Sequence, residues 1–135
     1  MLEDVKINVK IKLAALWTAV MFCYTYADIL AHMRSDILEG FLAGEVGGVQ
    51  ITQETLLGSA ILMMIPIVMI FLSLTLKAKA NRWANIILGI VYIVVDLATL
   101  LSPTEWVYYY IFAIAEAVLL ALIVWFAWKW PKQED

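Results

Sequence analysis

Four long apolar segments constrain the fold of this chain more than any other feature of its sequence. The segments span residues 11–31, 55–76, 83–101 and 106–130. A helix needs about 20 apolar residues to cross the hydrocarbon core of a bilayer, and each segment is close to that length. The segments lack the polar outer face of a soluble core helix and the alternating pattern of a membrane β-barrel. We therefore predict an all-α, polytopic membrane protein with four transmembrane helices in an up-down-up-down bundle.

The composition of the chain supports this fold class. Of its 135 residues, 64% are hydrophobic and 16% are charged, whereas about a quarter of a soluble domain is charged. This length has room for one domain, and we assign residues 1–135 to a single transmembrane domain. The one cysteine, Cys23, excludes an internal disulfide, a Cys-x-x-Cys redox pair and a thiolate metal cage. We predict no cofactor, no metal site and no nucleic-acid partner.

Basic residues are distributed unevenly between the two sides that such a bundle would have. Arg34 is the only one in the outer loop at residues 32–53. The other eight flank the spans on the opposite side: Lys6, Lys10, Lys12, Lys77, Lys79, Arg82, Lys129 and Lys132. Because short loops rich in Lys and Arg stay in the cytoplasm, we predict that both termini are cytoplasmic.

Local signals mark several helix ends. Thr52 is placed to cap the second helix, and Asn81 is placed to cap the third. Residues 102–105 read Ser-Pro-Thr-Glu, a capping box that should start the fourth helix. Pro66 should kink the second helix and leave one backbone carbonyl without its helical donor.

The outer loop has a pattern of its own. Residues 35–43 are expected to form a short helix at the membrane interface, with its leucine and phenylalanine side against the bundle. Phe41 and Leu42 need cover, and the glycines that follow permit a sharp return. We expect residues 35–50 to fold back over the outer mouth of the bundle.

Three carboxylates lie inside the predicted spans. An ionisable side chain at the centre of a membrane helix costs about 2.5–3.5 kcal/mol on insertion scales, so it should face the bundle interior or a wet cavity. Each carboxylate belongs to a polar stripe at helical spacing, and all three can lie in the outer half of the bundle. We take the carboxylates and three tyrosines of these stripes as ligand- or ion-binding candidates: Asp28, Asp96, Glu116, Tyr24, Tyr92 and Tyr109.

The same residues also have a purely structural interpretation. The tyrosines would then hydrogen-bond protonated carboxyl groups and hold the helices together, since low dielectric favours the neutral acid. Asp28 lies near the outer end of its helix, where it would reach only water or His32.

Three functions are compatible with these features. The first is a module that binds or transports a small ligand, a cation or a proton through the intramembrane carboxylates. The second is a non-catalytic accessory or assembly protein whose buried polar residues only specify helix packing. The third is a membrane enzyme that acts on a lipid-like substrate with an acid–base carboxylate pair. Candidate partners are the lipid bilayer, a small apolar or cationic ligand and a second copy of the chain.

Several runs of the sequence resemble a known family. They are residues 16–19 (Leu-Trp-Thr-Ala), 26–30 (Tyr-Ala-Asp-Ile-Leu), 42–48 (Leu-Ala-Gly-Glu-Val-Gly-Gly) and 81–89 (Asn-Arg-Trp-Ala-Asn-Ile-Ile-Leu-Gly). The family comprises short bacterial membrane proteins, is catalogued only as a domain of unknown function, and is broadly similar to the DoxX-like four-helix proteins. The resemblance implies a multi-pass protein of the bacterial cytoplasmic (inner) membrane. It implies no catalytic residue.

Overall fold

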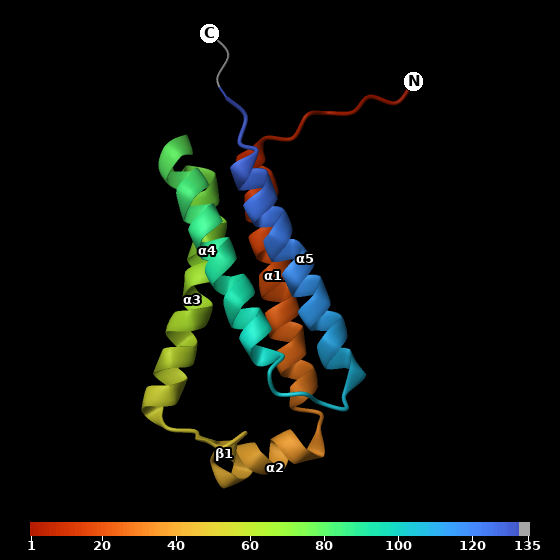
Figure 1. The fold of residues 1–135 in the computed structure, drawn as a ribbon, viewed down its shortest axis with the longest axis vertical. Coiled ribbons are helices and arrows are strands. Elements are labelled where there is room, and N and C mark those ends of the chain that lie inside the picture. Colours follow the sequence, from red (N-terminus) through yellow and green to blue (C-terminus); the bar gives the residue numbers. More distant parts are fainter. Residues whose placement is uncertain (133–135) are drawn as a thin grey trace.

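The structure, a computed structural model, describes residues 1–132 as four long helices, one short helix and one short hairpin. The helices are α1 (Val9–Ala31), α2 (Ser35–Ala43), α3 (Gln53–Thr75), α4 (Ala78–Thr99) and α5 (Val107–Trp128), and the strands are β1 (Glu45–Val46) and β2 (Val49–Gln50). Figure 1 shows the four long helices side by side, with α2 and the hairpin across one end. We call this end the loop end. The opposite end, where α1 begins, α5 ends and α3 turns into α4, is the terminal end.

Each of the four long helices is long and apolar enough to cross a membrane. The prediction of an all-α bundle with four transmembrane helices is therefore confirmed. The third span was expected to start at Trp83, but α4 begins at Ala78. Hydropathy marks the part of a helix that lies in hydrocarbon, and a helix can continue as a charged turn into the interface.

One of the three predicted caps is present. Thr52 caps α3 as predicted: its Oγ1 accepts from the Thr55 amide at 3.3 Å, and Thr55 Oγ1 accepts from the Thr52 amide at 2.8 Å. The prediction for Asn81 is wrong, because Asn81 lies inside α4. Its Nδ2 donates instead to the carbonyls of Ser73 at 2.7 Å and Leu76 at 3.3 Å. Asn81 thus satisfies the free carbonyls at the end of α3.

The capping box predicted at residues 102–105 is also wrong. Helix α5 begins at Val107, and its N-cap residue Trp106 makes no side-chain cap. Thr104 is used within the connection: its Oγ1 accepts from the Trp106 amide at 3.2 Å, and its amide donates to the Tyr110 hydroxyl at 3.1 Å.

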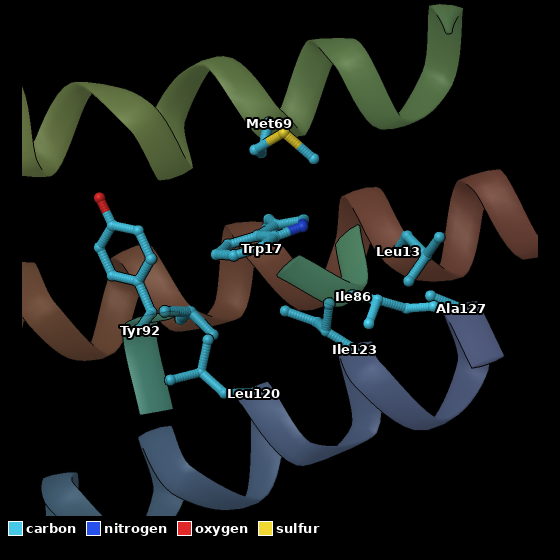
Figure 2. Close-up of a cluster of buried hydrophobic side chains, with 9 residues drawn as sticks. Leu13, Trp17, Met69, Ile86, Tyr92, Leu120, Ile123 and Ala127 are labelled. Carbon is cyan, nitrogen blue, oxygen red and sulfur yellow. The ribbon is translucent and has the colours of Figure 1, made fainter. Parts of the chain in front are cut away.

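Trp17 of α1 lies at the centre of the apolar core. Figure 2 shows Met69 of α3 on one side of its indole and Leu120 and Ile123 of α5 on the other. Helix α1 packs along both α3 and α5, α4 packs mainly along α5, and α3 meets α4 over a much smaller surface. Gly89 allows the close approach of α4 to α5, because a Cβ there would lie 2.7 Å from Val124 Cγ2.

The loop-end cover is built from α2 and the hairpin. The predicted short helix at residues 35–43 is present as α2 and ends at Gly44 in the left-handed conformation, with φ of 81°. The hairpin was not predicted. Gly47 and Gly48 have φ of 59° and 81°, as its two-residue turn requires. Leu42, expected to be covered, is exposed.

Candidate functional site

Polar groups in the terminal half of the bundle form a closed hydrogen-bond network of four fully buried side chains: Trp17, Ser73, Asn81 and Asn85. Trp17 Nε1 donates to Asn85 Oδ1 at 2.7 Å, and Ser73 Oγ donates to the same oxygen at 3.3 Å. Asn85 Nδ2 donates to the carbonyl and the side-chain oxygen of Asn81 at 2.9 and 2.7 Å. We call this the amide network. It joins three helices and pairs its groups with one another, as packing devices do.

Tyr92 has a related structural role one step nearer the loop end. Its hydroxyl donates to the backbone carbonyl of Leu62 in α3, and Figure 2 shows the hydroxyl directed at that helix. Leu62 lies four residues before Pro66, which has no N–H to offer this carbonyl. The Leu62 carbonyl is the one that Pro66 was predicted to leave without a helical donor. Tyr92, a predicted site residue, supplies the missing donor.

A cavity of about 200 Å³ lies in the loop half of the bundle between α1, α3, α4 and α5. We call it the carboxyl chamber. All six predicted site residues line it: Tyr24, Asp28, Tyr92, Asp96, Tyr109 and Glu116. Residues distant in the sequence are therefore brought together as the polar stripes predicted.

Asp96 and Glu116 form a buried pair in the chamber. Both residues line it, and they are only 4% and 6% exposed. Two neighbouring carboxyl groups in low dielectric do not both ionise, because their like charges repel. The pair therefore carries at most one negative charge.

The protein supplies little else to this pair. No donor among residues 1–132 reaches Asp96 Oδ2, and the buried Tyr24 hydroxyl also has no partner. The structural interpretation requires the three tyrosines to hydrogen-bond the carboxyl groups, and the part of the chain that the structure describes contains no such hydrogen bond. Tyr109 donates to the Thr99 carbonyl at 3.2 Å, and Tyr92 donates to Leu62. The chamber thus contains buried polar atoms without a partner, whereas every side chain of the amide network is hydrogen-bonded.

Asp28 lies at the edge of the chamber and is exposed. It lines both the chamber and a larger pocket of about 680 Å³ beneath α2 and the hairpin, which we call the loop-end pocket. His32 donates from Nδ1 to the Asp28 backbone carbonyl at 2.6 Å, and its ring packs against Phe41 at 4.8 Å between centroids. Because His32 binds only the backbone of Asp28, the Asp28 carboxylate remains available to both spaces.

Arg34 attaches the loop-end cover to the bundle. It pairs with Asp36 at 2.7 Å, donates to the Tyr108 hydroxyl at 3.4 Å and stacks over Trp106 at 4.8 Å. The hydrogen bond from Arg34 holds the pKa of Asp36 below its ordinary value. The sequence did not predict that Arg34 anchors the cover. The available signal was that Arg34 is the one lysine or arginine in the outer loop.

Among residues 1–132, no three His, Cys, Asp or Glu side chains converge as metal ligands do. The three carboxylates of the chamber thus do not form a set of the kind that binds zinc or other transition metals.

Four apolar helices that enclose a carboxyl pair define a small multi-pass membrane protein with a polar chamber within its bundle. Residues 3–135 match the model described as "Family of unknown function (DUF6326)", and the chain belongs to this family. The resemblance to a family known only as a domain of unknown function is thereby confirmed. Neither the curated proteins nor the solved structures contain a significant match to the chain.

Proposed function

We propose that this membrane protein binds a cation or a protonated small ligand at the Asp96–Glu116 pair. The observation that carries the proposal is a buried pair of carboxyl groups, on the wall of a chamber, to which the protein offers almost no donors. A bound ammonium group or monovalent cation supplies the donors or the positive charge that the pair lacks. Because a cation favours the ionised form of the pair, binding is coupled to proton release.

The charges at the loop end favour a positively charged ligand. The one lysine or arginine there, Arg34, is already paired with Asp36. Around it in the described part of the chain are six acidic residues: Asp28, Asp36, Glu39, Glu45, Glu54 and Glu105. An excess of one sign around an opening raises the local concentration of the opposite ion.

The path to the chamber runs from the loop end. Towards the terminal end, the apolar core around Trp17 and the amide network fill the bundle. The proposal is therefore a binding module open on one side. A transport cycle would also require the layer at Trp17 and Asn85 to open.

The orientation of this opening follows from the basic residues. Eight of the nine lysines and arginines flank the terminal end, so by the positive-inside rule the terminal end, with both chain termini, faces the cytoplasm. In the cytoplasmic membrane of a bacterium, the chamber then takes its ligand from outside the cell.

The test uses protein in lipid nanodiscs and methylammonium as the probe. Asp96→Asn and Glu116→Gln keep the shape of each side chain but remove its charge, and we expect either to abolish binding and the accompanying proton release. Glu3→Gln makes the same chemical change at the terminal end, away from the chamber and its opening, and should bind as wild type does. Calorimetry in two buffers of different ionisation enthalpy measures both quantities. Equal affinity in wild type and both chamber variants would refute the proposal.

A second function, an accessory or assembly protein, is favoured by the amide network, because its polar groups serve helix packing. In that case the Asp96–Glu116 pair is also a packing device. Wild type would then bind no cation, and the protein would co-purify with a stable membrane partner after mild solubilisation.

A further inference from the structure

We propose that the ligand is an amphiphilic amine, with its ammonium group between Asp96 and Glu116 and its apolar chain in the loop-end pocket. This inference rests on the proposed function, since it places the head group at the same carboxyl pair. It adds the chemical class of the ligand and a second binding region.

The first argument is the composition of the loop-end pocket. Its wall combines side chains from α1, α2, the hairpin and α3, and it is mostly apolar: Ala31, Leu38, Phe41, Val46, Ile51 and Leu56. Four of its polar members lie on α1 and α3, with Asp28 and His32 on one helix and Thr55 and Ser59 on the other, and Gln50 of the hairpin is the fifth. Apolar walls with a few placed polar groups are the usual construction of a small-molecule site.

The second argument is size. Drug-sized ligands occupy pockets of about 300–1,000 Å³. The loop-end pocket, at about 680 Å³, lies within this range, whereas the carboxyl chamber, at about 200 Å³, is too small for such a molecule. The chamber accommodates a head group or a small hydrated cation, and the loop-end pocket accommodates a larger apolar body.

The third argument is the connection between the two spaces. Asp28 is part of the wall of both, so a ligand can pass from one to the other along this side chain. Its exposed carboxylate lies on the path to the carboxyl pair. Acidic groups at two successive points favour an amine over a fatty acid of the same length, which would meet like charge at both.

The fourth argument is that α2 and the hairpin form a fixed cover over the pocket. Helix α2 packs closely on the hairpin, because a Cβ on Gly40 would lie 2.5 Å from the Glu45 carbonyl oxygen. Arg34 fixes the start of α2 to the start of α5 through Tyr108 and Trp106. The apolar cover over the pocket is thus part of the fold.

The experiment compares octylammonium with methylammonium, which has the same head group without the chain. Binding is measured against free aqueous ligand with wild-type protein in nanodiscs, and empty nanodiscs correct for partition into lipid. We expect octylammonium to bind about tenfold or more tightly than methylammonium, because its chain leaves water for the pocket. Octanoate, which has a chain of the same length and the opposite charge, should not compete.

A pocket-filling variant locates the chain. Ser59 lines the loop-end pocket but not the chamber, and Ser59→Phe should reduce octylammonium affinity to that of methylammonium while methylammonium binding stays unchanged. Ala60→Phe places the same ring on the next exposed position of α3, outside both spaces, and should change neither affinity. Ala31→Phe fills the pocket from α1 and provides a second test if Ser59→Phe does not fold.

The outcomes separate the two proposals. The inference is wrong, and the proposed function stands, if methylammonium binding depends on Asp96 and Glu116 but octylammonium binds no more tightly. It is equally wrong if Ser59→Phe and Ala60→Phe behave alike. Both proposals are wrong if the Asp96→Asn/Glu116→Gln double variant retains the wild-type affinity for both amines, or if wild type binds neither.

Discussion

The hydrogen bond between Tyr92 and the carbonyl of Leu62 exists because Pro66 leaves that carbonyl free, and this dependence can be measured. Tyr92→Phe removes the donor and keeps the ring, which packs edge-to-face on Trp17 at 6.1 Å between centroids. The carbonyl is then left without a partner between two apolar helices. Pro66→Ala restores an N–H at the position from which the helix itself serves this carbonyl.

The expected magnitude is modest. Interhelical hydrogen bonds in membrane proteins contribute about 0.6 kcal/mol on average and up to about 1.7, and an unsatisfied buried acceptor costs about 1–3 kcal/mol. We expect Tyr92→Phe to lower the free energy of unfolding by about 1–2 kcal/mol in the wild-type chain. In the Pro66→Ala background the same change should cost less than about 0.5 kcal/mol, because the backbone replaces the tyrosine as donor.

The assay is a double-mutant cycle, with unfolding in mixed detergent and denaturing micelles followed by circular dichroism. Tyr26→Phe is the matched control. Tyr26 is exposed and stacks on Phe22, so loss of its hydroxyl should leave stability unchanged. An equal cost of Tyr92→Phe in both backgrounds would refute the idea that the proline creates the acceptor.

Three further predictions concern orientation and packing. Reporters fused after residue 80 and at the C-terminus should read cytoplasmic, and one at Gly47 external; a cytoplasmic signal at Gly47 contradicts the orientation. Asn85→Leu removes the acceptor of Trp17 and Ser73 and should destabilise the bundle by about 2 kcal/mol, and an unchanged unfolding midpoint would argue against the amide network. Gly89→Ala should cost about 1–3 kcal/mol, since its Cβ overlaps Val124; increased thermal stability would show that α4 and α5 are not in close contact there.

The sequence predicted which face of each helix carries the residues of the candidate site. Asp96 and Glu116 could be placed inside the bundle because charge in hydrocarbon is costly wherever it occurs, and the helical period assigned Tyr24 and Asp28 to one stripe. The hydrogen-bond partners were not predictable. Tyr92 and Tyr109 bind backbone carbonyls, and their choice depends on the rotation of each helix against its neighbour.

Four features could be predicted from the sequence: the number of transmembrane helices, the cap at Thr52, the short helix at residues 35–43 and the helix faces that carry the acids. These features depend on transfer free energies and local propensities, which are summed along one segment at a time. Three others follow from tertiary packing: Asn81 serves the end of α3, Asp96 and Glu116 share one cavity, and Asp28 borders both the chamber and the loop-end pocket. Each of these contacts joins separate segments, so each depends on how the helices cross, tilt and rotate in the packed bundle.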